Sequence, residues 1–150
     1  MITTTEYFDT LLVGAALEHV VSGSYSGPLY GVQMGLIVGS FAPTKTSVLT
    51  DITQPIYTGY ALQATTFAPA SRDANGNIST LSGLILWQMT NNTNPTLVTG
   101  WFLVDSGGTH LLMAEMLDTP FSLVDTLSVL GLVALWSANN ADPGQGIVVS

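Results

Sequence analysis

The sequence contains no cysteine, and charged residues make up only 8% of its 150 residues. The absence of cysteine excludes disulfides, thiolate metal sites and cysteine nucleophiles. Lys45 and Arg72 are the only Lys or Arg residues, against ten acids, and the net charge is −8. Because two bases cannot neutralise a run of phosphates, we expect neither a nucleic-acid partner nor a polybasic membrane-surface patch.

Long hydrophobic runs are also missing. The best apolar stretch, Leu127–Trp136, is far shorter than the roughly 20 residues that a membrane-spanning helix needs, and Ser128 and Gly131 interrupt it. The first ten residues contain no Lys or Arg, so they lack the basic start of a secretory signal. We therefore expect a soluble chain with no membrane partner.

The composition is instead apolar and neutral. Hydrophobic residues make up 47% of the chain, and hydroxyl and amide side chains take the place of charged ones on the expected surface. A neutral surface on so apolar a chain protects poorly against self-association. The composition therefore predicts a protein that works inside an assembly, as a homo-oligomer such as a dimer or trimer.

One helix is expected, near the start of the chain. Apolar side chains recur at i, i+3, i+4 and i+7 from Phe8, which is the spacing of one helix face. Thr3 followed by Glu6 fits a capping box, and Gly23 is placed to end the helix. These signals predict a helix over Thr3–Val21. The alternative is a pair of short strands, Leu11–Val13 and Val20–Val21.

The rest of the chain is expected to form strands and turns without intervening helices. The candidate strands are Tyr30–Val38, Gly59–Phe67, Ile78–Met89, Leu97–Val104, Leu111–Met116 and Leu127–Trp136. Such a series predicts one mainly β domain, an antiparallel β-sandwich or jelly-roll-like fold with one N-terminal helix. Its parts would be a helical segment (1–23), a linker (24–29), the sandwich (30–138) and a tail (139–150).

Two turns carry the strongest hairpin signals. Asn75-Gly76 suits a type I′ turn, and Asp105-Ser106-Gly107-Gly108 separates two candidate strands. We predict that each joins neighbouring antiparallel strands, and that Leu97–Val104, which is apolar on both faces, is buried from both sides. A further turn is expected at Thr119-Pro120. Thr44–Pro55 breaks the strand pattern, and there Val48, Leu49 and Ile52 could line a helical turn or a loop that plugs one end of the sandwich.

Residues that carry chemistry are few. The two histidines, His19 and His110, stand at no metal-binding spacing. The loop Asp73–Asn77 is not an EF-hand, because Leu84 stands where the bidentate acid belongs. The G-x-S-x-G near-match at Gly23–Gly27 has tyrosine at its centre. We therefore expect no enzyme, no cofactor and no metal ion.

Four short segments in the middle of the chain form a recognisable pattern. Leu49–Thr53 (LTDIT) leads into Tyr57–Ala61 (YTGYA), and Gly100–Asp105 (GWFLVD) is followed by Leu111–Glu115 (LLMAE). In this pattern, over Thr46–Pro120, the chain resembles small virion structural proteins of tailed double-stranded DNA phages, of the head decoration (cement) or minor capsid type. The resemblance implies a structural component without catalytic residues.

The expected function follows from this resemblance and from the low charge. It is a phage capsid decoration protein that binds the outer face of the major capsid protein and stabilises the shell, in the phage head, after assembly in the bacterial cytoplasm. The alternative is a tail or host-contact module that binds glycan through exposed Trp87, Trp101 or Trp136. The possible assembly contacts are Phe8, Leu11, Leu12, Ala15 and Trp136. The four helix residues among them are equally expected to pack on the sandwich of their own chain.

Overall fold

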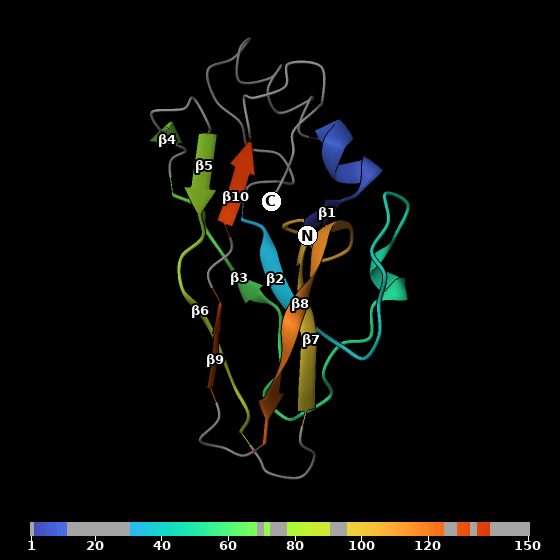
Figure 1. Cartoon of the computed structure of the whole chain (residues 1–150), viewed down its shortest axis with the longest axis vertical. Helices are drawn as coiled ribbons and strands as arrows, with labels where there is room; N and C mark the ends of the chain where they lie inside the picture. The colour runs from blue at the N-terminus through green and yellow to red at the C-terminus, as the bar shows by residue number, and fades with distance from the viewer. Residues whose placement is uncertain are drawn as a thin grey trace.

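A computed structural model describes residues 2–11, 31–68, 71–72, 78–90, 96–124, 129–132 and 135–138. This part of the chain is mainly β, and all its strand pairs are antiparallel. It contains one short α-helix, residues 6–11. The predicted fold class is therefore confirmed (Figure 1).

The largest sheet has five strands in the order β1-β8-β7-β2-β3. Its strands are β1 (Ile2–Thr4), β8 (Leu111–Leu123), β7 (Thr96–Val104), β2 (Gln33–Val38) and β3 (Gln63–Ala64). The long strands β2, β7 and β8 form its centre, and each overlaps a strand that the sequence predicted. The two edge strands are short, and β1 pairs with only residues 113–115 of the thirteen-residue strand β8.

A ribbon of two chain segments lies beside this sheet. β5 (Ile78–Leu81) pairs with β10 (Leu135–Ala138), and β6 (Ile85–Gln88) pairs with β9 (Val129–Leu132). Since β6 follows β5 and β10 follows β9, the two pairs are successive parts of what we call the ribbon. The sequence predicted one strand over Ile78–Met89 and one over Leu127–Trp136. Each is in fact divided into two, β5 and β6 in the first and β9 and β10 in the second. β4 (Ser71–Arg72) pairs with the other edge of β5.

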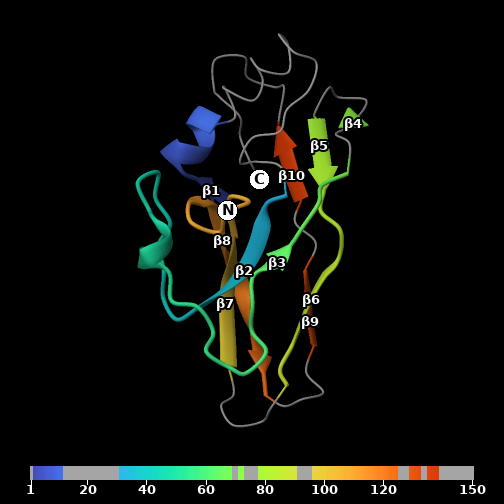
Figure 2. The same cartoon turned by 180° about the vertical axis from the view of Figure 1, so that it is seen from behind.

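Apolar side chains cover both faces of the five-stranded sheet, in a sandwich-like arrangement. The first core cluster packs the sheet against β6 and β9, with Met34, Leu36, Trp101, Leu103, Ile85, Trp87 and Leu130 among its buried members. The second covers the opposite face, with Ile37, Ile52, Phe102, Val104, Leu111 and Ala114. Figures 1 and 2 show the ribbon on one side of the sheet and the 3-10 helix η1 (Leu49–Asp51) on the other. Strand β7 is thus buried from both sides over its last five residues, 100–104, as predicted, whereas Leu97 near its start is exposed.

The segment between β2 and β3 forms the single helical turn that was one of the two predicted alternatives. The Asp51 carboxylate accepts a hydrogen bond from the Val48 backbone N–H (2.9 Å), which fixes the start of η1. Ile52 is buried in the second core cluster and Leu49 packs against it, whereas Val48 is exposed. The segment therefore covers a face of the five-stranded sheet.

The start of the N-terminal helix was predicted wrongly. Residues Ile2–Thr4 form β1 on the edge of β8, and the helix begins at residue 6. Thr5, not Thr3, caps it, because the Thr5 hydroxyl accepts a hydrogen bond from the Phe8 N–H (3.2 Å). The open edge of β8 offers backbone partners that outweigh helix propensity in the first residues. The remainder of the predicted helix, the linker (24–29) and the tail (139–150) lie outside the described residues.

The turn predicted at Thr119-Pro120 is also wrong, because β8 continues through it. Gly100 pairs with Met116 and Val98 pairs with Phe121, so residues 117–120 bulge out of the β7–β8 ladder. Proline has no N–H to donate, and a bulge is a position where a strand tolerates it.

Both predicted hairpin turns do join antiparallel strands. β7 and β8 meet at Val104 and Leu111, and Gly108 between them has a φ of +69°, which favours glycine. β4 and β5 pair on either side of Asn75-Gly76, although the turn residues themselves lie outside the described residues.

Candidate functional site

The outer face of β6 and of the residue before it carries two exposed leucines. Alternate residues point in opposite directions, so Ile85 and Trp87 are buried in the first core cluster, while Leu84, which precedes the strand, Leu86 and the polar Gln88 point away from it. Leu84 is 65% exposed and Leu86 is 56% exposed. The strand therefore has apolar side chains on both faces, but among the described residues a protein layer covers only one of them.

The facing strand β9 completes an apolar surface. Val129 is 43% exposed, and Gly131 is the residue opposite Leu86. A Cβ atom at Gly131 would lie 3.2 Å from methyl groups of both Leu84 and Leu86, so the two leucines lean over the glycine. We call these four residues the outer patch. Contiguous exposed apolar surface of this kind marks interaction sites, and neither β6 nor β9 contains a charged residue.

A second group of exposed apolar side chains lies where β7 begins and β8 ends (Figure 1). Leu97, Phe121 and Val124 are each more than a third exposed there. The two groups belong to different sheets, and both lie far along the chain from the N-terminal residues that the sequence favoured as contacts.

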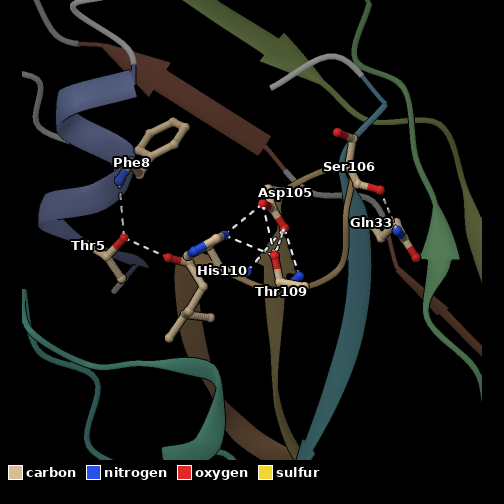
Figure 3. A network of polar contacts seen from close by, with 8 residues as sticks. Thr5, Phe8, Gln33, Asp105, Ser106, Thr109 and His110 are labelled. Atoms are coloured by element: carbon tan, nitrogen blue, oxygen red, sulfur yellow. Dashed lines mark hydrogen bonds and ion pairs between the residues drawn. The ribbon is translucent and has the colours of Figure 1, made fainter. Parts of the chain in front are cut away.

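The β7–β8 hairpin carries the polar network drawn in Figure 3. The buried Asp105 carboxylate accepts hydrogen bonds from the N–H groups of Thr109 (2.8 Å) and His110 (3.1 Å) through Oδ1. Its Oδ2 lies 2.9 Å from His110 Nδ1. Burial alone would raise the pKa of the Asp105 carboxyl, but the hydrogen bonds from His110 and Thr109 outweigh burial and lower that pKa below its ordinary value. A charged carboxylate therefore closes the turn.

The same hairpin holds the N-terminal residues. The His110 ring stacks on the Tyr7 ring, with centroids 4.4 Å apart and planes 19° from parallel. The Thr5 hydroxyl donates to the Leu111 carbonyl (2.7 Å), and the Thr5 N–H donates to the Leu112 carbonyl (2.8 Å). Leu112 is the extra residue of a bulge in β8, since Leu103 pairs with Met113 and Val104 with Leu111. Thr5 thus satisfies carbonyl groups at an irregular point of the strand.

Thr109 is not placed as the nucleophile of a nucleophile–base–acid triad with His110 and Asp105. The Thr109 hydroxyl lies 2.9 Å from His110 Nδ1, which is the same ring nitrogen that faces Asp105. In a triad the acid holds one imidazole nitrogen while the other accepts the proton of the nucleophile. Here both Asp105 and Thr109 meet the same nitrogen, so their contacts with His110 hold the turn together.

Two tryptophans predicted as exposed glycan contacts are buried, so that prediction is wrong. Trp87 is 2% exposed and its indole N–H donates to the Ala61 carbonyl (3.2 Å). Trp101 is 5% exposed and its N–H donates to the Glu115 carboxylate (3.0 Å). Both stand at inward-facing strand positions, and the buried N–H of each finds a partner inside the chain.

The predicted assembly contacts are only partly described. Phe8 is buried in the first core cluster of its own chain, and Leu11 packs against that cluster. Leu12, Ala15 and the side chain of Trp136 lie outside the described residues. The outer patch, in contrast, was not singled out. The signal that could have identified it is the unbroken apolar run Leu84–Trp87, which places apolar side chains on both faces of a strand.

The motif residues that carried the phage resemblance serve the fold. The half-buried Tyr60 hydroxyl accepts a hydrogen bond from the Leu36 N–H (3.0 Å) and lies 3.1 Å from Gln54 Oε1. Burial raises the pKa of Tyr60 to about 12. Burial also raises the pKa of Tyr57, whose ring meets the Tyr60 ring edge-on at 5.7 Å. These tyrosines attach the segment before β3 to the centre of the sheet.

Within the described ranges, no group of three or more His, Cys, Asp or Glu side chains could hold a metal ion. No helix of the same residues is long and apolar enough to cross a membrane. The chain was also compared with known proteins. No family model, curated protein or solved structure matches it.

Proposed function

We propose that the chain is a decoration (cement) protein of a tailed-phage head. It binds the outer surface of the major capsid protein, stabilises the shell without catalysis, and is assembled into the virion in the bacterial cytoplasm. The observation that carries this proposal is the outer patch, where Leu84, Leu86 and Val129 are exposed around Gly131 on two strands that contain no charge.

The outer patch suits docking on a repetitive surface. Its side chains stand on paired strands and their inner neighbours are fixed in the core, so docking orders little additional chain. Covering one largely exposed leucine gains about 1 kcal/mol or more at 25 cal/mol per Å². The gain per copy is modest, but a decoration protein repeats it at every position of the shell.

Self-association as a dimer or trimer is part of the proposal. Copies with a net charge of −8 repel one another, and they can approach most closely through surface that carries no charge. One such area is the outer patch. Light scattering on the isolated chain measures the oligomer mass, and a clean monomer at tens of micromolar would remove this part of the proposal.

Binding to phage heads tests the function directly. Heads that lack the protein, purified from the phage that encodes it, are mixed with the chain and sedimented. We expect Leu86→Asp to lower co-sedimentation at least tenfold, because burying a carboxylate against an apolar contact is costly. Ile56→Asp is the matched control, since Ile56 is 90% exposed in a loop outside the outer patch. Equal binding by both variants would contradict the proposed contact.

Copy number separates decoration from the tail or host-contact alternative. Gel densitometry of purified particles should find hundreds of copies per virion for a decoration protein. A few tens of copies or fewer would favour the tail module and overturn our proposal.

A further inference from the structure

The paired strands β6 and β9 have one flanked edge and one open edge. At the β6 edge the chain itself lies alongside. The Gly83 N–H donates to the Thr66 carbonyl (3.0 Å) just before the strand. The Thr90 N–H donates to the Thr58 carbonyl (3.3 Å) just after it. On the side of β9 that faces away from β6, no described residue forms a strand pair or a backbone hydrogen bond (Figure 1).

An open strand edge of this kind is a site for strand addition. In an antiparallel ladder, every second residue directs both its N–H and its C=O toward the same neighbouring strand. Two of the four residues of β9 therefore direct these groups away from β6. Such a row of groups is a template for a strand of another chain, and main-chain hydrogen bonds then supply the affinity.

Apart from β10, which follows β9, the other described strand edges are protected against such pairing. β1, β3 and β4 are only two or three residues long. Beyond Glu115, where β1 ends, β8 carries Asp118 and Pro120 and bulges at residues 117–120. Short strands, charges, prolines and bulges are the features by which proteins prevent edge-to-edge association. In contrast, residues 126–141 contain neither a charge nor a proline, and β9 pairs with β6 without a register shift.

The chemistry of the β9 edge fits a second copy of this chain. Two copies related by a two-fold axis perpendicular to the ribbon place their β9 strands antiparallel, so the same edge serves both copies. Each copy has a net charge of −8, and copies approach most closely where neither carries charge. Pairing of β9 with itself places no like charges opposite each other, an arrangement that would destabilise the pair.

Pairing at this edge also covers apolar side chains on both faces of β9. Val129 is 43% exposed on the outer face, and Leu132 is half-buried on the face that packs against the first core cluster. A neighbouring strand brings side chains within about 4.5–5.5 Å of each, between opposite Cβ atoms. The apolar area removed from water then adds to the backbone hydrogen bonds at about 25 cal/mol per Å².

We propose that β9 of one copy pairs antiparallel with β9 of a second copy, so that two ribbons form one sheet in the order β6-β9-β9-β6. The two-fold axis keeps the outer faces of both copies on the same side of this sheet. The two outer patches then adjoin and form one apolar surface of twice the area. This inference concerns the contact between copies and does not rest on capsid binding.

Engineered cysteines test the pairing, because the chain has none of its own. Pairing centred on Val129, Leu130 or Gly131 places the outer-face positions 129 and 131 of one copy opposite 129 or 131 of the other. Opposite Cα atoms lie about 4.5–5.5 Å apart, which a disulfide can bridge. Chains carrying only Val129→Cys are mixed with chains carrying only Gly131→Cys and oxidised. We expect a disulfide-linked dimer on a non-reducing gel, at a yield that rises with protein concentration.

The control is a mixture of Leu84→Cys and Leu86→Cys chains, whose cysteines are on the same face but one strand further from the edge. Across the proposed sheet, the two β6 strands are three strand spacings apart, or about 14 Å, which a disulfide cannot bridge. The control should therefore cross-link at least tenfold less. Equal cross-linking by the two mixtures would mean that outer patches pack face to face, and it would overturn the proposal.

Hydrogen exchange on the unmodified chain is a second readout that needs no cysteine variant to fold. Raising the protein from low micromolar to millimolar concentration should slow exchange at least tenfold for the outward N–H groups of β9. The N–H groups of β7 should exchange at the same rate at both concentrations. Unchanged exchange in β9 would overturn the proposal. Both experiments use the isolated chain without phage heads, so failure of edge pairing and failure of capsid docking are distinguishable.

Discussion

Strand pairs β7–β8 and β6–β9 are both apolar in sequence, but they differ in what covers them. In β7, Trp101 and Leu103 face the ribbon side of the sheet while Phe102 and Val104 face the η1 side, and all four are buried. In β6, Ile85 and Trp87 are buried, while Leu86 and the preceding Leu84 are more than half exposed. One pair is a central layer and the other is an outer layer with a surplus of apolar side chains.

The difference shows how to interpret a strand with apolar residues on both faces. Such a sequence indicates that both faces are suited to burial. Whether the same chain covers both of them depends on the fold. For β7 the segment around η1 covers the second face, through Ile52 and Leu49. For β6 and β9 the described chain supplies no such cover, and the surplus apolar area is what we assign to a partner. The predictions below test this contrast.

The largest expected effect is at the centre of the covered pair. Phe102→Ala should lower the free energy of unfolding by about 3–5 kcal/mol, because it leaves a cavity in a fully buried site. Leu84→Ala, on the exposed face, should change it by less than about 0.5 kcal/mol. Urea denaturation followed by tryptophan fluorescence measures both. Similar losses for the two variants would break the contrast between the pairs.

Gly35→Ala gives a somewhat smaller effect on the neighbouring strand β2. An added Cβ would lie 2.3 Å from the Phe102 ring and 2.7 Å from a methyl group of Leu62, so the packed second face must shift. We expect a loss of about 1–3 kcal/mol, the usual cost of overpacking. Gly83→Ala is the control, since nothing lies within 4 Å of its added Cβ. Thermal unfolding of both variants should show a lowered midpoint only for Gly35→Ala.

Much of the β7–β8 pair could be predicted from the sequence, because the residues that determine it are close together in the chain. Both apolar faces of Leu97–Val104 and the Asp105–Gly108 turn are visible within a dozen residues. The wrong predictions each depended on a partner distant in the chain. Thr3 fits a helix cap until β8, more than a hundred residues away, offers its edge to Ile2–Thr4. Pro120 indicates a turn until the register with β7 places it in a bulge.

The site was less predictable than the fold, for the same reason. Whether Trp87 or its neighbour Leu86 is exposed depends on which face of β6 meets the sheet. The alternation is visible in the sequence, but both faces are apolar, so nothing local decides their direction. Only the packing of the ribbon on the five-stranded sheet shows that the tryptophan faces inward and the leucine outward.

Asp105→Asn should have an intermediate effect, at the turn that closes the covered pair. An amide has one acceptor oxygen where the carboxylate has two, so we expect a loss of about 1–3 kcal/mol at pH 7. The pKa of Asp105 in the folded chain lies below its ordinary value of 3.8. Its stabilising contribution is therefore complete above about pH 3.8 and is lost as the pH falls through the lowered folded value.

Urea titrations between pH 2 and 7 test this dependence. The stability difference between the wild-type chain and Asp105→Asn should be constant near neutral pH and shrink in the acid range. Asp118→Asn, an exposed acid on β8, is the control and should follow the wild-type curve. A difference that stays constant down to pH 2 would mean that the Asp105 charge does not stabilise the turn.

The smallest effect on stability, and the sharpest test of the contrast, is expected for Leu86→Asp. If the outer face of β6 is free in the single chain, a carboxylate there stays hydrated and the free energy of unfolding changes by less than about 0.5 kcal/mol. Its consequence should appear in any self-association that uses the outer patch, as a lower mass in light scattering at tens of micromolar, while Ile56→Asp leaves the mass unchanged. A loss of several kcal/mol would instead mean that the outer face is covered in the folded chain, like both faces of β7. Leu86 would then be a core residue, and the surplus apolar surface that we assign to a partner would not exist.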